Sequence, residues 1–305
     1  MTVDVVIVGG GPAGLSAALS LGRARRSVVV VDAARPRNRT APHMHGVLGH
    51  DGRSPLDLRE SGRAEIARYG VEVISDEVTA ARVDGEHRQI EFGGGTIAAR
   101  RLLFATGAVD ELPDIEGMAQ EWGRGVVVCA YCDGWEHREH RVGVIAHSPT
   151  GVEQAQLLRQ WSDRVTFFPH RAGQPSPEDL RQLAGRGIAL ERGVVERVLS
   201  DDGGVVGIEV DGRVVDIDVV FTGPTLRPRD ALLREVGADV VDRGGIPWVA
   251  IDGDGRTSVD GVWAVGNVVD PRANVSMSLG LGSLVAGALN SDLLADDIRR
   301  AVSAR

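Results

Sequence analysis

Lysine is absent from this chain of 305 residues, and neither a basic patch nor a basic tail appears in it. The formal net charge is -9 at pH 7, so nucleic acids and anionic membrane surfaces are not expected partners. We find no run of the roughly 18 uncharged apolar residues that a membrane span needs. The first residues enter a strand without a basic leader or a cleavage site, which predicts a cytoplasmic protein.

Cysteine is almost absent as well. Cys129 and Cys132 are the only two, and they stand in the order Cys-Ala-Tyr-Cys directly before Asp133. In a cytoplasmic protein, two thiols separated by two residues favour a redox-active pair over a permanent cross-link. An inert buried pair is one alternative. A zinc site with His137 and His140 is another, but its two ligand pairs are closer together than the dozen or so residues usual in such sites. We expect redox chemistry and no metal.

Glycine, in contrast, is plentiful, and three glycines near the N-terminus stand in a G-x-G-x-x-G frame between an apolar strand and a helix. Gly9 permits the tight turn, Gly11 lets the backbone approach a pyrophosphate, and Gly14 packs the helix on the strand. The next strand ends at Asp32, which is placed to accept hydrogen bonds from an adenosine ribose. The pattern predicts an N-terminal dinucleotide site.

Two later strands have the character of cofactor-binding segments. Residues 101–107 end in Ala-Thr-Gly, and residues 261–267 end in Gly-Asn ahead of a helix expected over 275–294. Between them lies a second β-α-β pattern, which comprises a strand over 141–146, a helix over 151–161 and a strand over 164–168.

The order of these units predicts an α/β protein with two Rossmann-like dinucleotide-binding domains. The first would be discontinuous, formed by residues 1–114 and 227–305, with residues 115–226 inserted as the second. Proline and glycine near residues 113 and 223–228 are plausible connectors between the two.

The motifs occur in the order found in low-molecular-weight thioredoxin reductases, and the chain resembles that family over essentially its whole length. The resemblance implies bound FAD and a homodimer. It also implies that Cys132 faces the flavin, that Cys129 exchanges with substrate, and that Asp133 handles protons. The cofactor-binding positions indicated by the motifs and the resemblance are Gly9, Gly11, Pro12, Ala13, Gly14, Asp32, Asn38, His45, Val78, Thr106, Gly107, Gly266, Asn267 and Val275.

The second domain departs from the reductases' pattern. Where they carry Gly-x-Gly for NADPH, this chain has Ala146 and Ser148, whose side chains would fill the tight turn and the approach of the pyrophosphate. Their arginine pair for the 2′-phosphate is half retained, with His170 before Arg171. NADPH binding in the usual mode is therefore not expected, and a drifted, weakly functional site is the alternative.

The chain also resembles a branch of the family, the FAD-dependent dithiol oxidases of the gliotoxin and holomycin pathways. Trp135 after Cys-Asp-Gly, the segment 160–165 and Asn267 carry this resemblance. It implies an enzyme that closes a disulfide in a small-molecule dithiol of holomycin type, with O2 as acceptor and H2O2 as product. The alternatives are a thioredoxin-type disulfide reductase fed by NADPH or ferredoxin, and a non-catalytic flavoprotein or redox sensor.

Three of the eight histidines, His43, His45 and His50, lie within eight residues. In the family this segment passes the flavin, so His45 is a candidate for contact with the isoalloxazine or with a substrate thiol. Ordinary loop histidines and a His-x-His-x4-His metal site are the other interpretations, and the sequence leaves all three open.

Overall fold

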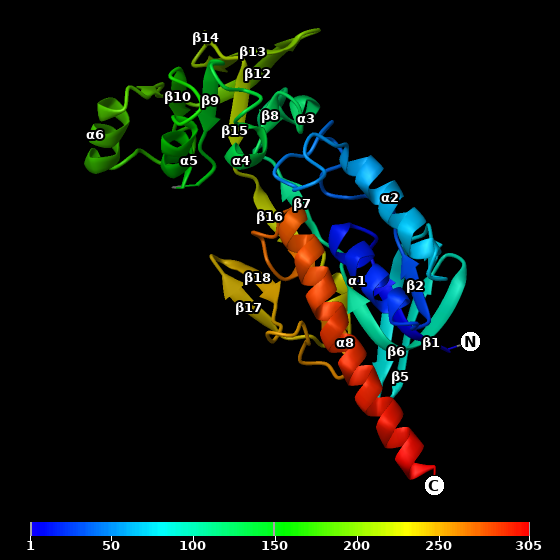
Figure 1. Ribbon diagram of the computed structural model, residues 1–305. Helices are drawn as coiled ribbons and strands as arrows, with labels where there is room; N and C mark the ends of the chain where they lie inside the picture. Colours follow the sequence, from blue (N-terminus) through cyan, green and yellow to red (C-terminus); the bar gives the residue numbers. More distant parts are fainter. Residues whose placement is uncertain (1, 149, 305) are drawn as a thin grey trace. The chain divides into compact units, whose positions relative to one another are not determined.

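The computed structural model describes residues 2–148 and 150–304, and these form two compact units (Figure 1). Unit 1 consists of residues 1–39, 56–109 and 226–305, and unit 2 consists of residues 40–55 and 110–225. The compact units differ from the expected domains in one respect, because residues 40–55 were expected in the first domain and belong to unit 2. Contacts distant in sequence tie this segment to unit 2, such as Gly123 packed against Thr40.

Unit 1 is built on a seven-stranded mixed sheet in the order β3-β2-β1-β6-β5-β4, with β19 also paired to β6. Strands β1, β2, β3, β6 and β19 are parallel, whereas β4, β5 and β6 are joined antiparallel. The bounds of these strands are β1 (Thr2–Val8), β2 (Val28–Val31), β3 (Glu72–Ile74), β4 (Val78–Asp84), β5 (His87–Phe92), β6 (Gly95–Phe104) and β19 (Val262–Ala264).

The central strands of this sheet are apolar throughout. Val28–Val31 is an unbroken run of buried valines, as expected for a parallel strand covered on both faces. Two helices that pack on each other, α1 (Pro12–Arg23) and α8 (Val275–Ser303), share a core with β1 and β2, in which Leu21 and Leu289 are fully buried. Figure 1 shows α8 lying along α1.

Helix α8 is long and apolar enough to cross a membrane, with a mean hydropathy of 1.2 over an 18-residue window that is 33% buried. The expectation that the chain holds no such segment is therefore wrong for this helix. Residues 273–291 carry no charge. Glycine and serine are spread among the leucines of this stretch, so it does not read as a continuous apolar run. A core helix of a soluble domain has the same length and composition.

The remaining elements of unit 1 are two helices, a pair of strands and a 3-10 turn. They are α2 (Pro55–Ala67), α7 (Ala231–Glu235), the antiparallel pair β17 (Val240–Arg243) and β18 (Ile246–Val249), and the 3-10 turn η1 (Gly266–Val268). At the boundary between the units, β7 (Ala108–Glu111) pairs with β16 (Thr225–Pro228).

Unit 2 contains a five-stranded sheet in the order β11-β10-β9-β15-β8, all parallel, and a separate antiparallel sheet β12-β13-β14. The strands are β8 (Val126–Val127), β9 (Val142–Ile145), β10 (Val165–Phe168), β11 (Ala189–Leu190), β12 (Val195–Asp201), β13 (Gly204–Val210), β14 (Arg213–Asp216) and β15 (Val219–Thr222). The helices are α3 (Met118–Glu121), α4 (Ala130–Asp133), α5 (Gly151–Leu158) and α6 (Pro177–Gly185).

The two faces of the parallel sheet in unit 2 bury different partners. Helix α5 lies over one face, where Val144 and Phe167 form a core with Leu158. Strands β12 and β13 cover the other face, where Ile145 and Phe168 meet Ile208. This sheet with its α5 crossover is the second Rossmann-like unit that the sequence predicts, so the α/β fold with two such sheets is confirmed.

Candidate active site

The two cysteines flank a single helical turn in unit 2. Cys129 is the N-cap of α4, and its sulfur is bonded to that of Cys132, with 5.2 Å between the two Cα atoms. The backbone N–H of Cys132 donates to Cys129 Sγ at 3.1 Å, and that of Asp133 donates to Cys129 O at 3.0 Å. A backbone donor aimed at a sulfur stabilises negative charge there, so this turn favours a thiolate at Cys129 when the disulfide opens.

The zinc arrangement suggested by the spacing is not formed. Within residues 2–148 and 150–304, no group of three or more His, Cys, Asp and Glu side chains is placed to hold a metal ion. His137 and His140 face each other instead, with 3.4 Å between their Nδ1 atoms. Burial and the neighbouring His140 lower the pKa of His137, which favours its neutral form.

Asp133, the residue directly after the second cysteine, is half-buried and electrostatically unusual. Burial, and to a smaller extent the negative charge of Glu136, raise its pKa from 3.8 to about 6. His45 acts in the opposite direction. A carboxyl group with a pKa near the working pH can both accept and return a proton, which is the property that acid–base catalysis requires.

His45 belongs to unit 2, next to the turn that carries the cysteines. Its Nε2 lies 3.5 Å from Glu136 Oε1, and its Nδ1 lies 3.6 Å from Asp51 Oδ1. The two neighbouring histidines have other surroundings: His43 Nδ1 faces the carbonyl of Gly52, and His50 Nδ1 faces Arg53. In the described part of the chain, the three therefore do not converge on one point as metal ligands would.

Two aromatic side chains are exposed beside the disulfide. Tyr131, between the cysteines, is 76% exposed and meets the edge of Trp161 at a centroid distance of 6.0 Å. Trp135 is 64% exposed, and the guanidinium of Arg138 lies 4.4 Å from its ring centroid. Exposed aromatic rings next to a reactive sulfur provide an apolar surface on which a small molecule can rest.

In unit 1 the glycine motif forms a tight cradle at the start of α1. Gly9 has φ +106°, and a Cβ there would lie 2.4 Å from Ala105 O. A Cβ at Gly14 would lie 2.0 Å from Gly9 O, so both positions exclude any side chain. Gly11 faces open space, and Pro12 and Ala13 begin the helix behind it. An open backbone at a helix N-terminus fits a pyrophosphate group.

A cavity of about 220 Å³ lies beside this cradle, at the end of β2. Asp32 forms part of its wall, and Ala34 N donates to Asp32 Oδ1. Arg59 on α2 donates to Asp32 Oδ2. The residues that line the cavity are Asp32, Ala33, Ala34, Arg35, Ser75, Asp76 and Glu77. An acceptor at the end of the second strand fits the ribose of an adenosine, so the cradle and cavity together fit the ADP part of FAD.

The Ala-Thr-Gly and Gly-Asn segments also lie in unit 1, each in a shaped turn. Thr106 Oγ1 donates to Arg229 O at 2.7 Å, and Arg229 N donates to Gly107 O at 2.9 Å. Gly266 begins η1 and packs against Ala13 of the glycine motif. The two segments are thus fixed by the chain's own hydrogen bonds and packing, and Gly266 lies next to the cradle.

Asn267 organises the loop that leads into α8. Its Nδ2 donates to Ala273 O at 2.9 Å and to Asp270 O at 3.0 Å, while its Oδ1 faces Arg37 Nη1 at 3.4 Å. Asn267 is one of the expected cofactor-binding positions, and the donors of its amide are used within the chain.

The last three expected cofactor positions are in unit 1 as well. Val275 is the first residue of α8, behind the N-cap Asn274. Asn38 is half-buried in a turn, and Val78 is the buried first residue of β4. None of the contacts described above connects these three positions with the cradle.

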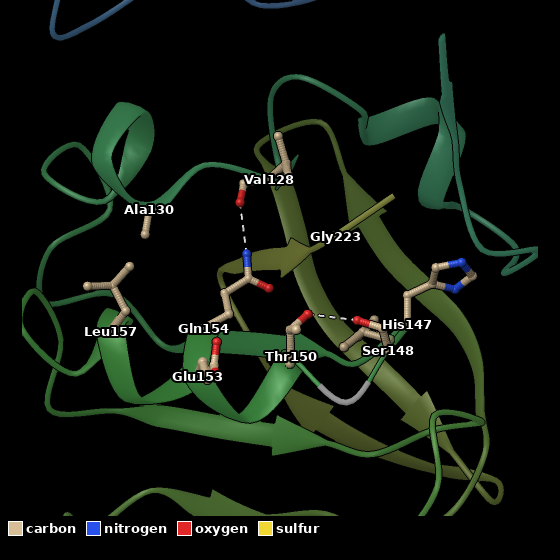
Figure 2. A pocket seen from close by; sticks show the side chains of 11 residues that line it. Val128, Ala130, His147, Ser148, Thr150, Glu153, Gln154, Leu157 and Gly223 are labelled. Atoms are coloured by element: carbon tan, nitrogen blue, oxygen red, sulfur yellow. Dashed lines mark hydrogen bonds between the residues drawn. The ribbon is translucent and has the colours of Figure 1, made fainter. Parts of the chain in front are cut away.

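A second cavity, of about 320 Å³, lies in unit 2 at the altered glycine motif, where a reductase would bind its nicotinamide nucleotide (Figure 2). Its residues come from the ends of β9 and β15, from α5, and from the segment that leads into the cysteine turn. They are Val128, Ala130, Ile145, His147, Ser148, Thr150, Gly151, Glu153, Gln154, Leu157 and Gly223. Gln154 Nε2 donates to Val128 O at 2.8 Å, which ties α5 to the strand before Cys129.

This crevice carries features unfavourable to a pyrophosphate. A Cβ at Gly151 would lie 2.7 Å from the Cβ of Ala146, so alanine at the first motif position already fills the space between strand and helix. Ser148 and Thr150 bond each other through their hydroxyls. Glu153 places a negative charge in the first turn of α5, where a dinucleotide would bring its phosphates.

Sequence reasoning missed Arg59, Glu136 and Glu153. Arg59 bonds Asp32, which lies 27 residues before it in the sequence. Glu136 belongs to the site because the segment around His45 packs next to it, and no local pattern indicates this contact. Glu153 carries a signal that local analysis can use, because it is an acid in the first turn of the helix after the altered glycine motif.

The two Rossmann-like sheets, one with a dinucleotide cradle and the other with a disulfide beside an acid, define a disulfide oxidoreductase. A family model for pyridine nucleotide-disulphide oxidoreductases matches residues 3–286. The chain belongs to this family.

Its relatives include two fungal proteins named thioredoxin reductase. The chain is 32% identical to tcpT of Claviceps purpurea over an alignment of 308 positions, which covers 96% of this chain and 95% of that protein. It is 31% identical to aclD of Aspergillus oryzae over an alignment of 313 positions, which covers 96% of this chain and 97% of that protein. The protein is thus a flavin-dependent thiol–disulfide oxidoreductase of the thioredoxin reductase family, whose members bind FAD.

Two solved structures share the whole fold. The crystal structure of HlmI has 44% sequence identity and a TM-score of 0.94, and the match covers 99% of this chain and 96% of HlmI. An oxidoreductase from Agrobacterium tumefaciens has 34% identity and a TM-score of 0.91, covering 96% of this chain and 99% of that one.

Proposed function

We propose that this protein is a dithiol oxidase that closes an intramolecular disulfide in a small-molecule dithiol of natural-product type. The observation that carries the proposal is the altered crevice of unit 2, where Ala146 fills the turn and Glu153 opposes phosphate. A crevice that disfavours NADPH leaves the substrate thiols as the source of electrons in this proposal. The similarity to HlmI and the sequence resemblance to the holomycin-type oxidases support the same function.

The residues around the disulfide would perform the exchange. The first thiol of the substrate loses its proton to Asp133, and its thiolate attacks Cys129 Sγ. Cys132 leaves as a thiolate, which takes that proton from Asp133. The second thiol of the substrate loses its proton to Asp133 and attacks the mixed disulfide. This step releases a cyclic disulfide and returns the proton to Cys129. The substrate loses two electrons and two protons, and the enzyme disulfide becomes a dithiol.

When bound, FAD would supply the transfer of two electrons from the enzyme dithiol to O2, with H2O2 as the product. In unit 1, Gly11 and the helix behind it would hold the pyrophosphate, and Asp32 would hold the adenosine ribose. Tyr131 and Trp135 would provide the apolar surface on which the substrate rests while its thiols reach Cys129.

We also propose a homodimer and a cytoplasmic location. Four apolar side chains of α8, Leu284, Leu294, Ile298 and Val302, are more than half exposed, which supports a second copy as their cover. The lone cysteine pair supports a reducing compartment.

A thioredoxin-type disulfide reductase is the second candidate. The names of the fungal relatives favour it, and a crevice of about 320 Å³ remains at the place where a reductase would bind its nucleotide. Ferredoxin could supply the electrons without that crevice, although the net charge of -9 disfavours docking of an acidic carrier.

The test is anaerobic mixing of the purified flavoprotein with NADPH and, separately, with dithiothreitol, while the visible absorbance of the flavin is followed. We expect bleaching by the dithiol but not by NADPH, and recovery of colour with formation of H2O2 when air is admitted. C129S should abolish bleaching by the dithiol. Rapid bleaching of the wild type by NADPH would instead establish the reductase.

A further inference from the structure

The segment 40–55 holds itself in a fixed shape against unit 2. Met44 N donates to Arg53 O at 2.9 Å, Gly52 N donates to Met44 O at 2.9 Å, and Gly46 N donates to Asp51 Oδ1 at 2.8 Å. These bonds close the segment into a loop that presents His45 toward the cysteine turn. His45 is 21% exposed at its side chain, so it is mostly covered by this packing.

His45 lies between two carboxylates, one from each side. Its Nδ1 faces Asp51 at 3.6 Å within its own loop, and its Nε2 faces Glu136 at 3.5 Å, three residues after Asp133. Both ring nitrogens of His45 therefore face a carboxylate oxygen, one from its own loop and one from the segment after the cysteine turn. His43 and His50 have no such pair of carboxylates, since the one faces a backbone carbonyl and the other an arginine.

We propose that His45 is a positioning residue for proton transfer: it pairs with Glu136, and the two side chains together determine how readily Asp133 takes up and releases a proton. The proposal rests on the role of Asp133 as the proton carrier in the proposed function. That role requires a balance, because Asp133 must take a proton from each substrate thiol and give it to each departing enzyme sulfur. An acid that is too weak would not release the proton, and one that is too strong would not accept it.

The charges around Asp133 agree with this assignment. Burial and Glu136 raise the pKa of Asp133, and His45 lowers it. His45 itself faces Asp51 and Glu136. The charge of Glu136 also acts on His137, whose pKa it raises, and His137 lies beside His140. Removal of His45 and removal of the Glu136 charge should therefore shift the titration of Asp133 in opposite directions, an outcome that a merely structural role does not produce.

The test measures the reduced protein, without substrate or electron acceptor. The cysteine pair is reduced with a phosphine, and its alkylation by iodoacetamide is followed as a function of pH in the wild type, H45Q, E136Q, H43Q and H50Q. The inflection that belongs to Asp133 is identified by its loss in D133N. We expect H45Q to move this inflection upward by about 0.5–1 pH unit, or roughly 3–10-fold in rate on the acid side, and E136Q to move it downward. H43Q and H50Q should overlay the wild type.

Coincident inflections in H45Q and the wild type would overturn the assignment. So would a loss of reactivity in H45Q that is equal at every pH, since that pattern indicates damage to the fold of the loop. If H45Q does not fold, H45N takes its place, with the same upward shift expected. A failure of the wild type to be bleached by a dithiol would contradict the proposed function, but it would leave these alkylation profiles readable.

Discussion

Arg59 holds Asp32 by two hydrogen bonds to one carboxylate oxygen, Oδ2, through Nη2 at 2.6 Å and Nε at 3.1 Å. Both side chains are largely covered, with 13% of Arg59 and 10% of Asp32 exposed. Asp32 also lines the cavity beside the glycine cradle. The arginine therefore fixes the carboxylate that is expected to receive the ribose of FAD, and it compensates a charge that burial would otherwise disfavour.

Replacement of Arg59 should thus harm both the fold and cofactor retention. We expect R59Q to lower the free energy of unfolding by about 1–3 kcal/mol, because it leaves a covered carboxylate without its partner. R59Q should also lose FAD more readily on gel filtration. Urea unfolding and the ratio of flavin to protein absorbance measure the two effects. The matched control is R63Q on the same helix, since Arg63 donates to the exposed Ser75 hydroxyl. Equal behaviour of the two variants would contradict this role.

The same pair shows what the sequence could predict and what it could not. Gly9, Gly14 and Asp32 belong to one local β-α-β unit, whose spacing alone determines their relation. Arg59 lies on α2, which no sequence motif predicts. Its pairing with Asp32 depends on tertiary packing. In the same way, the sequence marked Asp133 as a proton carrier, but its raised pKa depends on burial and on Glu136.

The division of the chain shows the same limit. Glycine motifs and apolar periodicity predicted the two Rossmann-like sheets, because these signals are local. The assignment of residues 40–55 to unit 2 depends on contacts such as those of Thr40 with Gly123, and of His45 with Glu136. Neither pair has a sequence signature.

Ala146 and Gly151 are coupled in the altered crevice. A Cβ at Gly151 would lie 2.7 Å from Ala146 Cβ, so G151A should overpack this contact and lower the free energy of unfolding by about 1–3 kcal/mol. A146G makes room for the new methyl group, and the double variant A146G/G151A should recover much of the loss. Urea unfolding of all four proteins in a double-mutant cycle measures the coupling. Additive effects would show that the two positions do not compete for the same space.

Asn267 supplies donors that an aspartate lacks. Its Nδ2 group bonds the carbonyls of Asp270 and Ala273, and N267D would place a carboxylate against these two carbonyl oxygens. We expect a loss of about 1–3 kcal/mol in the free energy of unfolding, together with weaker FAD retention. N274D is the matched control, because Asn274 caps α8 through its oxygen, which accepts from Met277 N, and aspartate keeps that acceptor. Similar losses in both variants would contradict the donor argument.

Asp133 should lower the stability of the folded protein at neutral pH while it supports activity, and its effect on stability should depend on pH. Its pKa is raised to about 6 in the folded protein from an ordinary value of 3.8. The folded state therefore binds more protons than the unfolded state between these values, and the contribution of Asp133 to stability falls as pH rises from about 4 to about 6. Above that range the ionised carboxylate opposes folding. Asparagine carries no charge to desolvate, so D133N should raise the free energy of unfolding by roughly 1–3 kcal/mol at about pH 7.5 and leave it unchanged near pH 4.

The same variant should lower the rate of bleaching by a dithiol by about 100-fold or more, since the proton carrier is gone. In the wild type this rate should decrease as pH falls below about 6, because protonated Asp133 cannot accept a thiol proton. Urea unfolding at the two pH values and anaerobic stopped-flow absorbance measure the two effects. The control is D163N, whose carboxylate is 90% exposed and should change neither quantity. If D133N were no more stable than the wild type at neutral pH, the carboxylate would not be disfavoured by its burial, and the basis for its proton chemistry would be lost.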